Sequence, residues 1–206
     1  DKIEITLAKA SSDQSYIKKL TSSGNYICSI GSIEVRKNQI LLYSVWKKLS
    51  KELTKVPPLV IIGRRGFLSE ELVHLITTDP DTKDKIIILS NIGDEVRDQI
   101  IDSSLFTVYP SFYEGWGLPI AESLSRGKLC IASNTTSMPE IAENLIPYIN
   151  PYDIESSFKE ILYLIQNPQV VLELEDKIHR SYQTTTWKKT TEEICKKIGD
   201  LFENSH

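Results

Sequence analysis

The chain has 206 residues, 40% of them hydrophobic, which is enough to bury a substantial core in one or two domains. Its formal net charge of −4 gives no reason to expect a nucleic acid as partner. No apolar run reaches membrane-spanning length and the first residues lack the apolar region of a signal peptide, so we expect a cytoplasmic protein. Cys28, Cys130 and Cys195 lie far apart and suggest neither a disulfide framework nor a metal cluster. Because the chain begins with Asp1, we expect a fragment or a processed product.

Residues 1–23 are polar and weakly patterned, and predict a connector with one short helix near residues 14–20. From Asn25 onward, short apolar segments alternate with helical patterns. The predicted strands cover residues 25–31, 57–63, 85–90, 105–110, 128–133 and 146–150. The predicted helices cover residues 37–53, 67–78, 118–126 and 138–143, with a further one beginning near Asp94, and then residues 154–166, 168–182 and 186–202. The first of them is expected to place its apolar residues near one face, namely Ile40, Leu41, Tyr43, Val45, Trp46 and Leu49.

The alternation of strands and helices predicts a doubly wound α/β domain, in which helices cover both faces of a parallel sheet. We expect this domain to span residues 24–206, with a helical segment from about residue 154. Ligands of such sheets bind beyond the carboxyl ends of the strands. All candidate motifs of a donor site described below follow predicted strands and therefore lie at that edge.

The sequence YPSFYEGWGLPIAE, residues 109–122, predicts a strand, a sharp turn and a helix. Gly115 and Gly117 bracket Trp116 in the turn, and Pro119 suits the first turn of the helix. Glycine lets backbone N–H groups approach a ligand closely, and a helix N-terminus adds partial positive charge. The turn therefore suits a phosphate or a polar sugar.

Two carboxylates, Glu114 and Glu122, flank this turn and are suited to accept hydrogen bonds from the hydroxyls of a sugar or a ribose. With seven residues between them, they resemble the E-x7-E motif of retaining GT-B glycosyltransferases of family 4, the glycosyl transferases group 1. The surrounding sequence PSFYEGWGLPIAES is similar to the family's sequence at nearly every position, with Trp116 where phenylalanine is more common. The alternative is an ordinary strand–turn–helix with a capping glutamate.

The resemblance implies that Glu114 holds hydroxyls of the transferred sugar near the reaction centre and that Glu122 holds the ribose hydroxyls. It further implies that backbone N–H groups of the turn contact sugar and phosphate. The other donor-binding residues implied around the two strand ends are Gly31, Ser32, Ser111, Gly115, Trp116, Gly117 and Leu118.

The segment GSIEVRKNQ, residues 31–39, resembles the family segment in which a lysine at the start of a helix binds the donor diphosphate. Lys37 falls on that position, with Arg36 beside it. Fixed cations stabilise the negative charge that builds up on the leaving diphosphate. Many relatives have arginine directly after the glycine, where this chain has Ser32. We therefore expect either that Arg36 supplies the second positive charge or that the site uses a single positive charge. The alternative for Arg36 and Lys37 is a solvated helix start.

The loop LSNIGDEVR, residues 89–97, by resemblance packs on the nucleotide base through the backbone around Asn91 and Ile92. Asp94 is either the N-cap of the following helix or an acceptor for the N1 and N2 hydrogens of guanine. Uracil offers no such pair of donors. The sequence Arg-Lys-Asn at 36–38 also resembles the corresponding sequence of mannosyltransferase-like members, which use a guanosine donor.

Three further motifs are assigned to turns and loops. GRRG at 63–66 predicts a turn in which Arg64 or Arg65 alternatively contacts substrate or another domain. The D-x-D at 79–81 follows a helical pattern, not a strand, and predicts a turn and no metal site. NTTSMPE at 134–140 is expected to hold the loop under the donor, with Thr135 or Thr136 alternatively reaching phosphate.

The resemblance covers residues 25–150 most fully and implies the donor-binding half of an enzyme whose N-terminal acceptor domain is absent, with residues 1–23 as the interdomain connector. We expect transfer of a hexosyl group, from a GDP-mannose-like donor rather than a UDP-sugar, to a saccharide or lipid-linked acceptor in bacterial surface polysaccharide synthesis. No metal or other cofactor is expected, and the full-length protein is expected to associate peripherally with the cytoplasmic membrane. The alternatives are a non-catalytic nucleotide-binding module and a dinucleotide-dependent enzyme, the latter disfavoured because no G-x-G-x-x-G follows the first strand.

Overall fold

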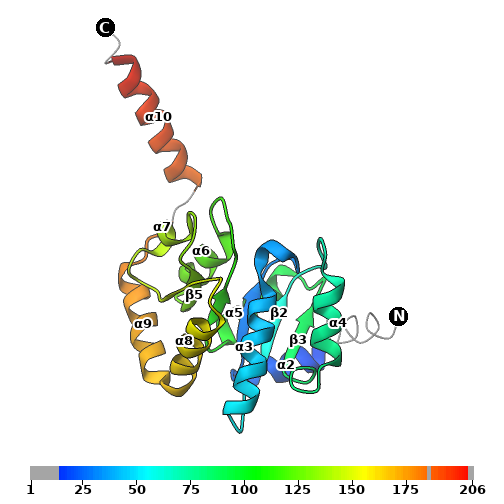
Figure 1. Ribbon diagram of the computed structural model, residues 1–206. Helices are drawn as coiled ribbons and strands as arrows, with labels where there is room; N and C mark the ends of the chain where they lie inside the picture. The colour runs from blue at the N-terminus through cyan, green and yellow to red at the C-terminus, as the bar shows by residue number, and fades with distance from the viewer. Residues whose placement is uncertain (1–13, 185–186, 204–206) are drawn as a thin grey trace.

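A computed structural model describes residues 14–184 and 187–203 of the chain (Figure 1). Within these residues, six strands form one parallel sheet in the order β3-β2-β1-β4-β5-β6, which confirms the doubly wound architecture. Each strand is the core of a predicted apolar segment: β1 (Ile27–Ile30), β2 (Leu59–Ile62), β3 (Ile86–Leu89), β4 (Thr107–Tyr109), β5 (Cys130–Ser133) and β6 (Tyr148–Ile149).

Helices connect successive strands and then complete the chain. They are α2 (Gln14–Ser23), the 3-10 turn η1 (Val35–Lys37), α3 (Gln39–Glu52), α4 (Glu70–Thr78), α5 (Asp94–Ser103), α6 (Leu118–Ser125), α7 (Met138–Ala142), α8 (Ile154–Gln166), α9 (Pro168–Ser181) and α10 (Trp187–Glu203). The helix expected within the polar first segment is present as α2. The first thirteen residues of the expected connector lie outside the described part of the chain.

The sheet separates two apolar clusters. In β2, Leu59 and Ile61 belong to the cluster under α3 and α4, whereas Val60 and Ile62 face the cluster that α2 and α5 cover. Both faces of the strand are therefore buried, which is why the strand reads as a continuous apolar run. Figure 1 shows α3, α4 and α8 in front of the sheet, and α2 packs beside α5 on the other cluster.

Helix α3 follows its predicted apolar face with one exception. Trp46 and Leu49 are fully buried, and Trp46 Nε1 donates to Pro57 O at 3.0 Å. Ile40, predicted on the buried face, is 42% exposed, and Leu42 is buried instead. Ile40 lies in the first turn of the helix, where its side chain lines a cavity between α3 and α4.

The carboxyl ends of β1 and β2 approach each other through two glycines. A Cβ atom on Gly63 would lie 1.9 Å from the backbone oxygen of Gly31, so no other residue fits there without displacing the backbone. Gly31 itself has a φ of 140°, which favours glycine. This contact fixes the loop that leads from β1 to Lys37.

We predict that Gly63→Ala lowers the free energy of unfolding by about 2–4 kcal/mol, because the clash is with backbone and cannot be relieved by a side-chain rotation. Denaturant unfolding followed by circular dichroism would measure this loss. Gly93→Ala is the matched control: Gly93 has a negative φ of −71° and its Cβ would meet nothing within 4 Å. Equal stability of the two variants would contradict the prediction.

Candidate functional site

One oxygen of Glu114 is the meeting point of the loops after β1 and β4. Oε1 accepts hydrogen bonds from Lys37 Nζ at 2.7 Å, Arg36 Nη1 at 2.7 Å, Ser111 Oγ at 2.7 Å and Tyr109 OH at 2.9 Å. The side chain of Glu114 is only 11% exposed and that of Lys37 only 12%. Oε2 accepts no hydrogen bond from the described residues, so it is available to a ligand. The structure thus brings together the three residues predicted to be catalytic.

Backbone hydrogen bonds hold these loops in place. The carbonyl of Arg36 accepts from Phe112 N at 2.9 Å, which ties the loop after β1 to the loop after β4. Ser137 Oγ donates to the Glu114 carbonyl at 2.9 Å, which adds the loop after β5. The segment 134–140 therefore supports the site, as predicted for it.

Asn38 is a structural residue of this junction that sequence reasoning did not identify. It lies between η1 and α3 with a left-handed φ of 56° and is 2% exposed. Its Nδ2 donates to Pro110 O at 3.0 Å and to Pro151 O at 2.9 Å, so it connects the ends of three strands. The only signal in the sequence is an asparagine, a residue that tolerates left-handed backbone, directly before the helix.

Tyr109 is a second residue that the sequence analysis missed. It is the last residue of β4, is 2% exposed, and its hydroxyl accepts from Lys37 Nζ at 2.5 Å while donating to Glu114. Lys37 Nζ also lies 5.0 Å from the centre of the tyrosine ring. Burial is the main reason that the pKa of Tyr109 is raised, so the phenol stays protonated and can donate.

The environment keeps Glu114 ionised. Burial alone would raise the pKa of this carboxyl, but hydrogen bonds from Lys37, Ser111 and Tyr109 lower it further than burial raises it. The net pKa lies below its ordinary value near 4.5. An ionised carboxylate accepts hydrogen bonds and cannot act as an acid at neutral pH.

The turn before α6 presents backbone donors beside Glu114. Gly117 has a φ of 110°, and a Cβ there would lie 2.9 Å from Ile141 Cδ1, so the position requires glycine. The N–H groups of residues 115–118 have no hydrogen-bond partner among the residues that the structure describes. Trp116 is 43% exposed and Leu118 is 65% exposed. The predicted backbone donors are therefore free to meet a ligand.

Glu122 lies one turn into α6 and is partly exposed. Its carboxylate forms no hydrogen bond or ion pair within the described ranges. Burial lowers the pKa of Arg97, but the hydrogen bond to Asp98 and the nearby charge of Glu122 raise it above its ordinary value. The two glutamates thus differ: Glu114 is tightly bound within the protein, and Glu122 is open to a ligand.

The loop after β3 lies at one end of the carboxyl edge of the sheet and is largely exposed. Asn91 is exposed, with a φ of 58°, and Ile92 packs on the cluster under α5. The N-cap of α5 is Gly93, so the alternative that Asp94 caps this helix is wrong, and its contact with a base stays a prediction. Gly93 has extended backbone, and the helix begins with the next residue, Asp94. The helix thus starts one residue earlier than it would if Asp94 were the N-cap. Its side chain is 87% exposed and pairs with Arg97 Nη1 at 2.9 Å.

The D-x-D at 79–81 forms a turn at the end of α4. Asp79 accepts from Tyr43 OH at 2.5 Å, from Lys47 Nζ at 2.6 Å and from the backbone N–H of Asp81 at 2.9 Å, so its oxygens are engaged within the protein. Across the described part of the chain, no group of three or more potential ligands is arranged to hold a metal ion. Within the same part, no helix is long and apolar enough to cross a membrane.

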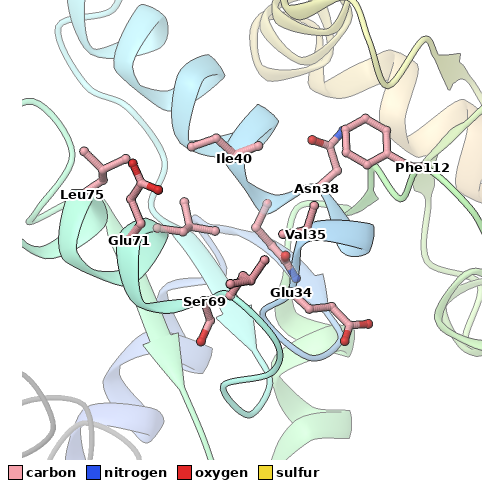
Figure 2. A pocket seen from close by; sticks show the side chains of 11 residues that line it. Glu34, Val35, Asn38, Ile40, Ser69, Glu71, Leu75 and Phe112 are labelled. Carbon is pink, nitrogen blue, oxygen red and sulfur yellow. The ribbon is translucent and has the colours of Figure 1, made fainter.

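A cavity of about 270 Å³ lies between the N-terminal ends of α3 and α4, beside the site and not within it (Figure 2). Figure 2 shows Val35, Ile40 and Leu75 around this space, with the carboxylate of Glu34 directed away from it. Glu34 Oε1 instead pairs with Arg36 Nη2 at 2.8 Å. None of the predicted donor-binding side chains lines this cavity.

The fold and the edge loops define a Rossmann-like domain of the GT-B type. The Anabaena protein HepE, whose structure was determined in complex with UDP, superimposes with a TM-score of 0.75 at 16% identity, over 92% of this chain and 54% of that one. The family model described as Glycosyl transferases group 1 matches residues 12–183. The chain belongs to this family.

Two Escherichia coli proteins are among its relatives. O-antigen chain mannosyltransferase B is 34% identical over 143 residues, which are 69% of this chain and 37% of that protein. The serotype-specific mannosyltransferase WbdA is 27% identical over 143 residues, 69% of this chain and 18% of that protein. The chain thus spans well under half the length of these relatives.

We predict that Tyr109→Phe raises the pKa of Glu114, because it removes one hydrogen bond to the carboxylate while keeping the ring. A carboxyl with a depressed pKa adds stability above its unfolded pKa, near 4.5, and that stability is lost as pH falls through its folded pKa. As the pH falls, the stability of the variant should therefore begin to decrease at a higher pH than that of the wild type. At pH 7 its free energy of unfolding should be lower by about 1–2 kcal/mol. Carboxylate NMR titration and unfolding at several pH values would measure both.

The control is Tyr113→Phe, since Tyr113 lies in the same loop and is 61% exposed. An unchanged Glu114 titration in Tyr109→Phe would show that the phenol hydroxyl does not stabilise the carboxylate.

Proposed function

We propose that this chain is the donor-binding part of a retaining glycosyltransferase that transfers a hexosyl group from a nucleoside diphosphate sugar to a saccharide or lipid-linked acceptor. One observation carries the proposal. A buried carboxylate with one free oxygen, two cations and a row of unpaired backbone N–H groups lie together at the carboxyl edge of the sheet. This set matches the hydroxyls and the diphosphate of such a donor.

Each group has a definite role in this proposal. Lys37 and Arg36 stabilise the negative charge that develops on the diphosphate as the glycosidic bond breaks. The N–H groups of residues 115–118, at the start of α6, bind phosphate and sugar oxygens. Glu114 accepts from hydroxyls of the transferred sugar through its free oxygen, and Glu122 accepts from the ribose. We expect no metal requirement, because these side chains and the helix N-terminus supply the positive charge.

We infer a guanosine donor carrying mannose. The relatives named above are called mannosyltransferases, and Asp94 presents an exposed carboxylate in the loop after β3, which the proposal assigns to the base. A carboxylate accepts both the N1 and N2 hydrogens of guanine. We further infer a place in bacterial surface polysaccharide synthesis, as the name of the O-antigen relative suggests, with peripheral membrane association of the full-length protein.

Additional polypeptide is part of the proposal. Because the relatives are much longer than this chain, we expect the acceptor to bind mainly to a second domain. The isolated chain should then bind nucleotide but catalyse little or no transfer. Efficient transfer by this chain alone would refute that part of the proposal.

We predict that the chain binds GDP and that Glu122→Ala weakens this binding about tenfold or more, because the ribose hydroxyls lose their acceptor. Isothermal titration calorimetry with GDP, UDP and ADP would measure it. Glu173→Ala on α9 is the control, since Glu173 is an exposed glutamate outside the site. Binding of all three nucleotides that is insensitive to Glu122→Ala would argue against the proposed site.

We predict that Asp94→Asn reduces the preference for GDP over UDP by roughly five- to fiftyfold, since an amide cannot accept two guanine hydrogens as a carboxylate does. The affinity for UDP should change little. Glu95→Gln, the neighbouring exposed acid on α5, controls for the change in charge. A preference for UDP in the wild type would keep the enzyme class and overturn the guanosine donor.

A further inference from the structure

In the structure, the two cations assigned to the diphosphate are bound to the protein's own carboxylates. Lys37 Nζ and Arg36 Nη1 both lie 2.7 Å from Glu114 Oε1, and Arg36 Nη2 lies 2.8 Å from Glu34 Oε1. Glu114 Oε1 therefore stands where charged donors from the loop after β1 converge. An oxygen of a bound diphosphate would satisfy the same donors.

The ligand and the carboxylate compete for these donors. A diphosphate brings at least two negative charges, and an ionised carboxylate among the same donors repels it strongly in a partly buried site. Two of the four donors to Glu114 carry no charge, namely Ser111 and Tyr109. Tyr109 ends β4 and Ser111 lies in the loop that follows it and carries Glu114, so both can keep their hydrogen bonds to the carboxylate when the cations turn to a ligand.

We propose that Glu114 is a built-in competitor of the diphosphate, which holds Lys37 and Arg36 in the free protein and releases them when a nucleoside diphosphate sugar binds. This inference rests on the proposed function and adds an exchange to it. The released carboxylate keeps its bonds to Ser111 and Tyr109 and accepts from hydroxyls of the transferred sugar. Binding of the diphosphate and recognition of the sugar are thereby coupled through one side chain.

The exchange favours the donor over the spent nucleotide. A nucleoside diphosphate sugar compensates the loss of the ion pairs with sugar hydroxyls that bond to Glu114. A nucleoside diphosphate takes the cations without offering hydroxyls there, so Glu114 recovers Lys37 and promotes release of the product. The competitor should therefore weaken binding of GDP or UDP more than binding of the corresponding sugar nucleotide.

The test compares GDP and UDP binding by calorimetry for the wild-type chain and for Glu114→Gln, which removes the charge at nearly constant shape. We expect the variant to bind the nucleoside diphosphate roughly three- to tenfold more tightly, against the usual expectation for a binding-site residue. The gain should be smaller or reversed for GDP-mannose and UDP-glucose. Thermal unfolding of each variant confirms that it is folded.

Two further variants make the result specific. Glu34→Gln removes the same charge from a carboxylate that contacts Arg36 but not Lys37, and should change the affinity less than twofold. In a Lys37→Met background, the gain from Glu114→Gln should disappear, because the contested cation is gone. In this double-mutant cycle, competition predicts that the effects of Glu114→Gln and Lys37→Met on the binding free energy do not add.

The outcomes separate this inference from the proposed function. If the wild type binds GDP or UDP and Glu122→Ala weakens binding, but Glu114→Gln binds equally or less tightly, Glu114 is no competitor and the donor site stands. An equal gain in Glu34→Gln, or a gain that persists in Lys37→Met, also overturns the inference. Absence of nucleotide binding by the wild-type chain overturns both.

Discussion

The geometry of the functional edge depends on the burial of one ionised carboxylate. Removing a carboxylate from water is costly unless charged or polar donors replace its hydration. Glu114 is 11% exposed, and its donors come from two loops that are more than seventy residues apart in sequence. Those loops can meet only because β1 pairs with β4 in the middle of the sheet, with Cys28 opposite Thr107. The strand order and the electrostatics of the site therefore both require the loops after β1 and β4 to lie side by side.

Close backbone contacts make this arrangement possible. Gly63 lets the end of β2 touch Gly31, and the side chain of Lys37 covers Gly31 with carbon atoms 3.6 Å from where a Cβ would be. Gly117 gives the start of α6 the conformation that leaves its N–H groups unpaired. Small residues therefore bring backbone N–H groups and cations close together at the carboxyl edge of the sheet, as the proposed donor site requires.

The sequence predicts the sheet and the common edge at which Lys37 and Glu114 lie, but not the ion pair between them. Carboxyl ends of parallel strands meet at one edge, so Lys37 after the first strand and Glu114 after the fourth are expected near each other. It does not predict Tyr109 or Asn38, because their roles arise from contacts across 72 and 113 residues that depend on strand order and side-chain direction. The misplaced cap at Asp94 has a local cause: a shift of one residue at the helix start changes the capping residue, and composition does not fix that shift.

The two ends of the candidate donor site are constrained to different degrees. At the diphosphate end, several loops and a buried carboxylate determine one another, so a change in one of them disturbs the rest. At the base end, Asn91 and Asp94 are exposed, and Asp94 bonds only within its own helix among the described residues. Side chains of this kind can vary without cost to the fold. The overall similarity to a protein determined with UDP assigns the fold and not the base, and under the proposed function the nucleotide preference resides in the few residues of the loop after β3.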